Sequence, residues 1–340
     1  MTLIILIIVL ALVFDFLNGF HDAANSIATV VTTRALTPWQ AVIWAAIFNF
    51  VAVVLFGTGV AKTISDKLID PSAIDIWVVF GGLVGGIVWN LLTWYLALPT
   101  SSSHAIISAL AGSAITKAGW HVLLLKGWEP VLLFLVLSPL LGMILGYIFM
   151  HIVAWLTWRT PRRKVEHTFR HLQLASAAAY SLGHGSNDAQ KTMGIIVALL
   201  VASGHASWTR GQTTFLGHHE IALWIILSCQ AAMGLGTLSG GWRVVRTMGS
   251  RITPHLHYAG GFSAEFAAAV TIGLATVAKI PISTTHAIGG AVSGVGATRG
   301  VHAVRWIWAR RVIIGWILTF PGAALIGAVG YEIVHLLARS

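Results

Sequence analysis

The stretch "LPTSSSHAI" at residues 98–106 has a near-copy at residues 280–288, "IPISTTHAI". Each copy contains a proline, at least three consecutive hydroxyl side chains and a histidine, and each interrupts a strongly apolar sequence. Proline lacks a backbone N–H and is tolerated in the first turn of a helix, so each copy marks a point where a helix is interrupted or begins. The chain therefore repeats one polar helix start within segments that are otherwise apolar.

The composition predicts an all-α, polytopic membrane protein. Of 340 residues, 56% are hydrophobic and 9% are charged, whereas a soluble domain carries about 25% charged residues. Apolar runs of the kind that cross a bilayer as helices occupy residues 2–14, 40–61, 76–98, 131–158, 221–238, 262–278 and 312–335. The first run has no basic segment before it and no small-residue cleavage site after it, which favours a retained helix over a secretory signal.

The basic residues lie between the apolar runs. The formal net charge is +10, and its densest cluster is "WRTPRRKVEHTFRH" at residues 158–171. This distribution follows the positive-inside rule, so we expect a cytoplasmic loop here and no nucleic-acid partner. A single cysteine, Cys229, excludes an intramolecular disulfide and a multi-cysteine metal site, and the sequence predicts no metal site and no cofactor.

A second pair of motifs indicates an internal duplication. Residues 19–29, "GFHDAANSIAT", align with residues 185–195, "GSNDAQKTMGI", at an offset of 166, whereas the two prolines are offset by 182. We expect the extra residues of the second half around 203–220, and we predict a first repeat at 1–158, a basic cytoplasmic loop at 159–170 and a second repeat at 171–340. No charge precedes Asp15, which favours an external N-terminus. An external N-terminus and an internal central loop require an odd number of crossings, hence inverted repeats with both termini outside.

The duplicated motifs place two acids in register, Asp22 and Asp188, beside Asn25 and Asn187. Intramembrane acids mark ion or substrate pathways by default. The alternative is that each acid caps a helix, but the duplication favours function. We expect the helix to be broken at 18–25 and at 183–190, where free carbonyls and a carboxylate would together bind a coupling cation.

The two halves differ at two positions of this motif. Lys191 stands where the first half has Asn25, and His21 stands where the second half has Asn187. An ammonium near Asp188 would compete with a bound Na⁺, and a histidine exchanges a proton near neutral pH. The pattern favours protons over Na⁺ as the coupling ion, with snorkelling of Lys191 to the interface as the alternative. Asp15 and Glu265 fit a proton route or an aqueous vestibule, and we rank them below the paired acids.

The hydroxyl clusters predict an anion site. A helix that begins inside the membrane presents free N–H groups and the positive end of its dipole, and hydroxyls add donors. The donors would come from Ser101, Ser102, Ser103, Ser283, Thr284 and Thr285. The alternative is contact between helices, where serine and threonine are common. His104 and His286 follow the clusters and either hold these segments in place or serve as structural donors. No nucleophile elbow surrounds either cluster, and one nucleophile would suffice, so we predict no enzyme activity.

These four motifs together resemble the inorganic phosphate transporter (Pit) family, and they are spread over both halves. From the two hydroxyl motifs we expect broken helices or re-entrant hairpins that meet near the bilayer midplane. The resemblance implies a duplicated inverted fold and secondary transport of inorganic phosphate by symport with Na⁺ or H⁺. On matching positions it implies a phosphate cradle of the six hydroxyl residues and an ion-coupling and substrate-proximal shell of Asp22, Asn25, Asn187 and Asp188. His21 and Lys191 depart from the sodium-coupled branch and resemble the bacterial low-affinity, proton-coupled type.

That type is thought to carry phosphate as a neutral complex with a divalent metal. Because the bacterial type is the one that the chain resembles, the resemblance also implies a secondary transporter in the inner membrane of a bacterium. A sodium-coupled phosphate symporter, a sulfate permease of the same family and a passive anion channel remain as alternatives. Helices rich in tryptophan and in small residues are compatible with a homodimer.

Overall fold

The computed structural model describes residues 1–340 except 53–56, 212, 215–216, 219, 255 and 340. The first half contains α1 (Thr2–Thr32), α2 (Pro38–Val51), α3 (Gly59–Asp66), η2 (Pro71–Ala73), α4 (Ile76–Tyr95), α5 (Ser102–Ala118), η3 (Trp120–Val122) and α6 (Leu125–Thr157). The second half contains α7 (Arg162–Ala202), η4 (Ala206–Thr209), β1 (Thr213–Thr214), β2 (Gly217–His218), α8 (Leu223–Ser239), α9 (Trp242–Arg246), η5 (Thr247–Arg251), α10 (Tyr258–Val277), α11 (Thr284–Ala297), η6 (Val301–Ala303) and α12 (Trp306–Arg339). The strands form a two-residue antiparallel ladder in the α7–α8 connection.

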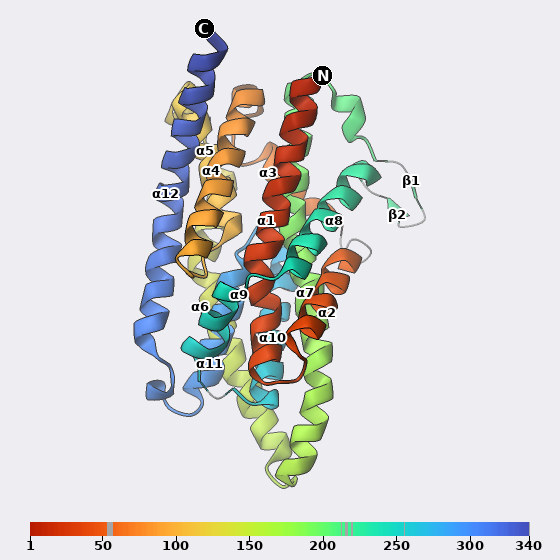
Figure 1. Ribbon diagram of the computed structural model, residues 1–340, viewed down its shortest axis with the longest axis vertical. Helices are drawn as coiled ribbons and strands as arrows, with labels where there is room; N and C mark the ends of the chain where they lie inside the picture. The colour runs from red at the N-terminus through yellow and green to blue at the C-terminus, as the bar shows by residue number, and fades with distance from the viewer. Residues whose placement is uncertain (53–56, 212, 215–216, 219, 255, 340) are drawn as a thin grey trace.

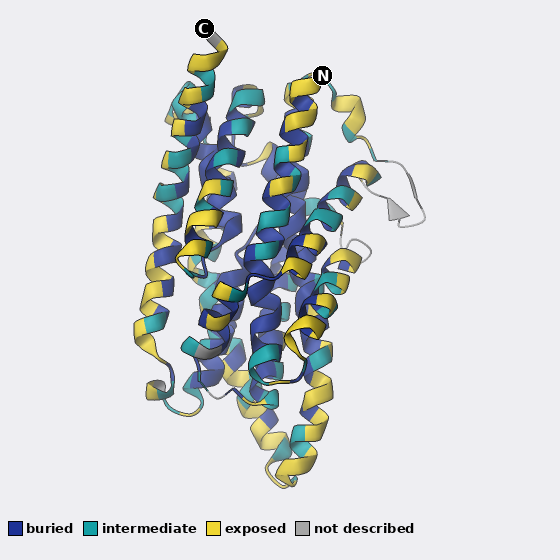
Figure 2. Ribbon diagram, in the orientation of Figure 1, coloured by how far each residue is buried: buried dark blue, intermediate teal, exposed yellow. Residues whose placement is uncertain are grey.

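The prediction of a multi-pass helical membrane protein is confirmed. Among the described helices, α1, α4, α6, α10 and α12 are long and apolar enough to cross a bilayer, and α8 with the following segment, bent by 61°, makes a sixth. The apolar run expected at 40–61 forms the shorter helix α2, and its residues 53–56 lie outside the described part of the chain. In Figure 2 the buried residues form the centre of the bundle, while exposed residues line the outside of α12. The exposed side chains of α12 include Ile317, Leu325 and Leu336, as expected of a helix that faces lipid.

The duplication extends to how the helices pack. The last helix of each half covers the hairpin of the other half: α6 packs on α10 and α11, and α12 packs on α4 and α5. Both of these long helices contain an internal proline at a matching position: Pro139 of α6, which also contains Pro130, and Pro321 of α12 are 182 residues apart, like the prolines of the hydroxyl motifs. The extra residues of the second half lie where they were expected, because α7 and α8 are joined by residues 203–222 and α1 and α2 only by 33–37.

Matching helices run in opposite directions. In Figure 1, α1 runs from the end of the bundle that carries both termini to the opposite end, and α7 runs back from the far end. The α6–α7 connection lies at that far end. The basic segment there is mostly helix, since α7 begins at Arg162 and its exposed first turns include the Arg162–Glu166 ion pair (Nε–Oε1, 2.8 Å).

The predicted breaks at 18–25 and 183–190 are wrong, because α1 and α7 continue through both motifs. The glycines of these motifs serve helix packing instead. A Cβ on Gly19 would lie 2.2 Å from the carbonyl oxygen of Met233 on α8, and one on Gly185 would lie 2.4 Å from that of Asn49 on α2. The backbone therefore stays hydrogen-bonded within the helix, and it frees no carbonyls for a cation.

The interruptions occur instead at the two hydroxyl motifs. Each lies in a turn between two helices, α4–α5 and α10–α11, and each turn contains a residue in the left-handed region, Ala97 (φ 54°) or Lys279 (φ 60°). Ser101 and Ser283 are the N-caps of α5 and α11, and their hydroxyl oxygens accept from the backbone N–H of His104 and His286, at 3.2 Å in both cases. The sequence thus correctly predicts two helices that begin inside the bundle.

Candidate functional site

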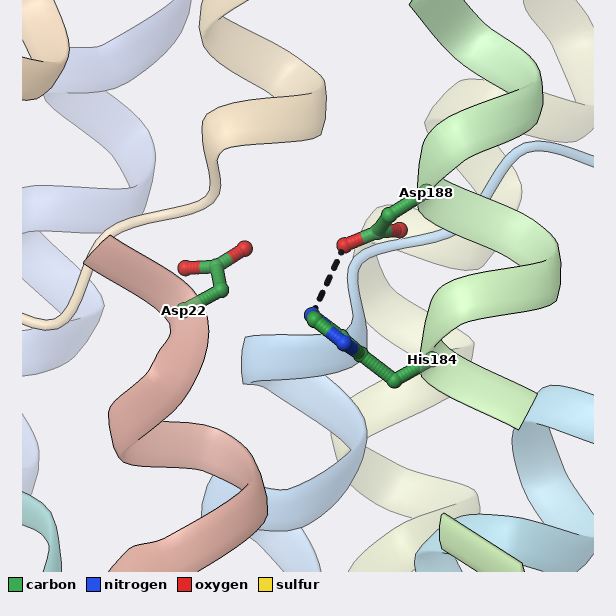
Figure 3. Close-up of side chains that lie close together, drawn as sticks. All are labelled: Asp22, His184 and Asp188. Atoms are coloured by element: carbon green, nitrogen blue, oxygen red, sulfur yellow. Dashed lines mark ion pairs between the residues drawn. The ribbon is translucent and has the colours of Figure 1, made fainter. Parts of the chain in front are cut away.

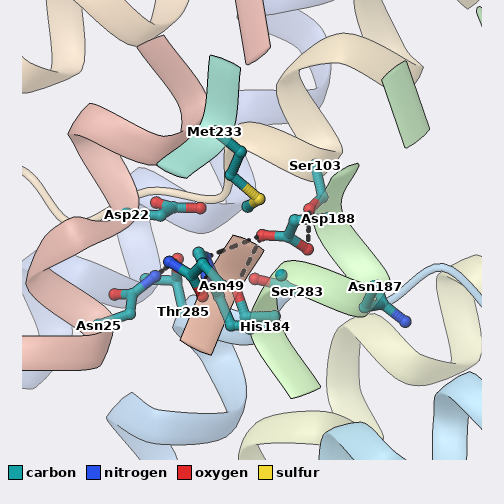
Figure 4. A network of polar contacts seen from close by, with 12 residues as sticks. Asp22, Asn25, Asn49, Ser103, His184, Asn187, Asp188, Met233, Ser283 and Thr285 are labelled. Carbon is teal, nitrogen blue, oxygen red and sulfur yellow. Dashed lines mark hydrogen bonds and ion pairs between the residues drawn. The ribbon is translucent and has the colours of Figure 1, made fainter. Parts of the chain in front are cut away.

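The two hydroxyl-rich helix starts meet the middle of α1 and α7 at the centre of the protein. Figure 4 shows this polar cluster, to which α1 contributes Asp22 and Asn25 and α7 contributes His184 and Asp188. All four of these side chains are buried, and so are all six predicted hydroxyl residues. A buried polar group is stabilised by a hydrogen-bond partner in the protein or by a bound ligand. The contacts of each side chain therefore show which groups remain available to a ligand.

An ion pair between Asp188 and Lys191 dominates the α7 side. The Lys191 ammonium donates to Oδ1 of Asp188, to the hydroxyl of Ser103, and to the carbonyl oxygen of Ile282 at 2.8 Å. All three of its donors are therefore used. Thr284 donates to the second carboxylate oxygen of Asp188 at 3.1 Å. Lys191 is 1% exposed, so it does not snorkel to the membrane interface.

The α1 side repeats this arrangement without the charge. Asn25, which matches Lys191, donates through Nδ2 to the hydroxyl of Thr285 at 2.8 Å. Thr285 matches Ser103 at the offset of 182, and its hydroxyl donates to the carbonyl of Thr100 at 3.2 Å. Each half thus reaches from its first long helix to the hydroxyl motif of the other half. This crossed contact ties both helix starts to the two motifs that carry the acids.

His21 and Asn187 occupy matching positions, and both hold the hairpins. His21 Nδ1 lies 3.0 Å from Oδ1 of Asp22, and its Nε2 lies 3.3 Å from the hydroxyl of Thr93 at the end of α4. The Asn187 amide donates to Thr276 (3.0 Å) and to the carbonyl of Ile280 (3.3 Å), and its oxygen accepts from the N–H of Ile282 (3.3 Å). Asn187 consequently points away from the acids in Figure 4. The structure brings Asn25, but not Asn187, to the cluster.

The hydroxyl side chains differ in the partners that they already have. Ser101 and Ser283 already cap helices, while Ser103 and Thr284 contact Asp188. In the described part of the chain, the hydroxyls of Ser102 and of the neighbouring Thr100 are buried without a hydrogen-bond partner. Ser102 lies in the first turn of α5, where backbone N–H groups are also free, so an anion here would meet unused donors.

His104 and His286 face each other rather than the acids. Their ring centroids are 4.9 Å apart in an edge-on arrangement, and His286 stacks on Trp316 of α12 at 3.8 Å. Trp316 also donates through Nε1 to the carbonyl of Pro99 at 3.0 Å. These contacts join the two helix starts, and the supporting role of both histidines stays a prediction.

Sequence reasoning missed His184. It lies one turn before Asp188 on α7, with Nε2 3.2 Å from Oδ2 of Asp188. Figure 3 shows that it points between Asp188 and Asp22, and one ligand atom from each of the three residues lies within 4.8 Å of the others. The spacing of four residues, which puts two side chains on one helix face, was the signal that could have revealed it.

The two acids that we ranked lower have different surroundings. The oxygens of Glu265 accept from Gln173 (3.0 Å) and from Ser176, both on α7. Asp15 is fully buried on α1, close to Thr192 and Cys229, and neither of its oxygens has a hydrogen-bond partner among the described residues. Asp15 therefore carries an unpaired carboxyl near the Asp188–Lys191 pair, while Glu265 is held in a structural network.

Comparison with known proteins agrees with this architecture. The profile of the Phosphate transporter family matches residues 18–327. A probable low-affinity inorganic phosphate transporter of Rhizobium meliloti is 47% identical, over 99% of this chain and 98% of its own. A protein of the same description in Bacillus subtilis is 43% identical, over 98% of both chains. A solved structure described as the sodium-dependent phosphate transporter superposes with a TM-score of 0.84 at 25% identity, covering 99% of this chain and 100% of the other. The chain belongs to the phosphate transporter family.

Proposed function

We propose that the chain is a proton-driven symporter of inorganic phosphate that carries the anion as a complex with a divalent metal. Membership of the phosphate transporter family supports the substrate. The observation that carries the coupling ion is the buried pair of Lys191 and Asp188. The Lys191 ammonium already occupies the Asp188 carboxylate, which a Na⁺ ion would need. In the other half Asn25 stands in place of the lysine, so Asp22 has no ammonium beside it.

Phosphate would bind between the starts of α5 and α11. The free N–H groups and dipoles of these helices favour an anion, and Ser102 supplies an unpartnered hydroxyl. Ser103, Thr284 and Thr285 would become further donors when phosphate replaces Asp188 and the carbonyl of Thr100 as the acceptor of their hydroxyl protons, and Asn25 would hold Thr285 in place. Weak, numerous and mostly neutral donors suit a site from which the ligand must also leave.

The acids favour phosphate over sulfate. Near neutral pH phosphate carries at least one O–H group, which can donate to a carboxylate such as Asp22 or Asp188. Sulfate has no proton to donate, so its oxygens would face these carboxylates with like charge. A site with acceptors beside the anion discriminates by leaving the wrong ligand unpaired.

The proton route would pass through the buried acids. Asp15 has a carboxyl without a partner among the described residues, near the Asp188–Lys191 pair, and His21 contacts Asp22. An unpaired buried carboxyl is suited to take up and release a proton as the site opens and closes. The rival is sodium coupling, because the solved relative is described as sodium-dependent.

The same proposal includes the arrangement in the membrane. We infer two inverted repeats, 1–158 and 171–340, because matching helices run in opposite directions in Figure 1. The basic segment 159–170 would lie in the cytoplasm by the positive-inside rule, with both termini outside, in the inner membrane of a bacterium. Each hairpin, covered by the long helix of the other half, would rock about the shared site. We also infer a homodimer, for which exposed tryptophans such as Trp39 and Trp155 offer surface.

Uptake of labelled phosphate into proteoliposomes tests the function. We expect accumulation above the external concentration when a proton gradient is imposed, and little competition by excess sulfate. Uptake that stops at equal concentrations would indicate a passive channel, and abolition by sulfate would contradict the phosphate assignment.

Removal of the Ser102 hydroxyl is expected to weaken phosphate binding. Loss of one donor to a charged ligand costs about 1.5–3 kcal/mol, or roughly a 10- to 150-fold increase in the apparent KM for phosphate. Ser102→Ala should therefore bind weakly while it remains folded. Ser108→Ala is the matched control, because that hydroxyl on the same helix donates to the carbonyl of His104. Equal KM values for the two variants would show that Ser102 only packs.

A further inference from the structure

A cavity of about 420 Å³ opens on the side of the bundle between α6 and α12. Its lining side chains are apolar or aromatic except for Ser293, whose hydroxyl already donates to the carbonyl of Gly289 at 2.8 Å. The buried glycines Gly289 and Gly290 of α11 lie at its base. Gly289 stands where the matching helix α5 has Ile107, at the offset of 182, so the missing side chain leaves room for an apolar ligand.

The cavity opens toward lipid rather than water. Exposed side chains form its rim, with Val136 and Leu140 on α6 and Ile313 and Ile317 on α12. Both helices are long and apolar enough to cross the bilayer. Water does not fill an apolar cavity that offers it no polar partner. A lipid acyl chain meets no such barrier, so it is the ligand that fits this cavity.

Arginines gather at one end of the cavity. Each of these four arginines is next in sequence to a residue that lines it: Arg251 to Ile252, Arg305 to Trp306, Arg310 to Ala309 and Arg311 to Val312. The backbone N–H of Arg305 donates to the carbonyl of Ile252 at 3.0 Å, which joins the two segments. The guanidinium carbons of Arg251 and Arg311 both lie over Trp308, at 4.4 and 4.8 Å from its ring centre. We call these four residues the arginine cluster.

Among the described residues, no carboxylate forms an ion pair with the arginine cluster. The sequence contains no aspartate or glutamate between Glu265 and Glu332. Positive charges held this close repel each other unless an anion lies between them. The end of the cavity that carries the cluster is therefore complementary to an anionic group, and the rest of the cavity is complementary to hydrocarbon.

From this combination we propose that the cavity binds an anionic phospholipid, with one acyl chain between α6 and α12 and the phosphate group at the arginine cluster. In Figure 1, α12 begins at the end of the bundle that carries the α6–α7 connection. This end is cytoplasmic in the arrangement proposed above, and the anionic lipids of the cytoplasmic leaflet attract basic residues. The choice of leaflet rests on that proposed orientation, whereas the site itself does not.

A lipid in this cavity would contact the residue that joins the two helix starts. Trp316 lines the cavity, stacks on His286 and donates to the carbonyl of Pro99. An acyl chain packed against the indole would hold it in this position. The bound lipid would therefore stabilise the contact between the starts of α5 and α11.

Native mass spectrometry of the purified full-length protein tests the site, with phosphatidylglycerol compared against phosphatidylcholine of the same acyl chains. We expect one phosphatidylglycerol to bind each chain in preference to phosphatidylcholine and to raise the Tm. Arg305→Gln combined with Arg310→Gln should weaken its binding on the order of 25-fold, about fivefold for each arginine. The matched control, Arg159→Gln with Arg163→Gln, removes the same charge from exposed positions of the basic segment and should keep the wild-type affinity.

A second pair of variants tests the part of the site that holds the acyl chain. Ser293→Phe places a ring in the cavity and should weaken the binding of both lipids. Ser239→Phe makes the same change at an exposed position of α8, where the hydroxyl also donates to a carbonyl of its own helix, and should leave both affinities unchanged. If Ser293→Phe lowers the Tm measured without lipid, Ile313→Trp narrows the exposed rim instead and should weaken binding in the same way.

Three results would overturn the proposal. The first is phosphatidylglycerol that binds no more tightly than phosphatidylcholine, or that binds the Arg305 and Arg310 variant as tightly as the wild type. The second is displacement of bound phosphatidylglycerol by inorganic phosphate alone, which would assign the arginines to free phosphate. The third is a Ser293→Phe protein that keeps both lipids but loses dimer mass in light scattering, which would assign the cavity to a second copy of the chain. None of these readouts measures uptake, so a failure of proton-coupled transport would leave the lipid site intact.

Discussion

Asp188→Asn is expected to abolish phosphate uptake and to lower the stability of the folded protein. The substitution leaves the Lys191 ammonium buried, at 1% exposure, without its anion. Removing one partner of a buried ion pair costs about 3–5 kcal/mol. It also removes the carboxylate to which Ser103, His184 and Thr284 are turned. The loss should appear as a lower Tm in detergent together with background uptake in proteoliposomes.

A double substitution distinguishes the two effects. Asp188→Asn combined with Lys191→Met removes both charges, and replacement of a complete buried pair is often neutral for stability. We expect the Tm of the double variant to recover most of the loss, while uptake remains at background. If the single variant has the stability and uptake of the wild type, the pair has neither the structural nor the functional role given to it here.

Lys191→Asn is expected to make the protein responsive to Na⁺. The substitution gives the second half the residue that the first half has at Asn25, and it frees Asp188 from its ammonium. A unit charge about 4 Å from a bound cation opposes it by about 4 kcal/mol at an effective dielectric constant of about 20. Its removal should therefore strengthen Na⁺ binding on the order of 100-fold or more. Because an ion that binds only the folded state stabilises it, Na⁺ should raise the Tm of this variant.

The controls for this prediction are the wild type and Lys62→Asn. Lys62 is an exposed lysine whose ion pair with Glu220 (Nζ–Oε2, 3.4 Å) lies on the surface, so its loss changes the net charge equally and leaves the site alone. Neither control should gain Na⁺-dependent stability or uptake. A Tm of Lys191→Asn that is insensitive to Na⁺ would show that the ammonium does not exclude sodium.

The sequence was most informative where a local motif was repeated. Pro99 and Pro281, with the hydroxyls after them, predicted two helix starts inside the bundle, since proline and N-capping act over a few residues. Gly19 and Gly185 led to the wrong prediction of helix breaks, because the sequence does not distinguish a glycine that permits a break from a glycine that permits close packing. What distinguishes them is the backbone of Met233 and Asn49 on other helices.

The missing part of the site depends on contacts that are distant in sequence. His184 contacts Asn49, which lies 135 residues away in sequence. The amide of Asn49 in turn donates to the hydroxyl of Thr237. No local sequence pattern predicts such a chain of hydrogen bonds. Lys191 shows the same limit, because whether a lysine in a membrane helix snorkels or pairs depends on how deep the helix lies in the bundle.

The most direct test of proton-coupled phosphate symport is uptake into proteoliposomes under one gradient at a time. Labelled phosphate is offered either with an acidic exterior in the absence of Na⁺, or with external Na⁺ at equal pH on both sides. We predict accumulation of phosphate in the first condition and only equilibration in the second. Accumulation driven by Na⁺ and unaffected by the pH gradient would contradict proton coupling.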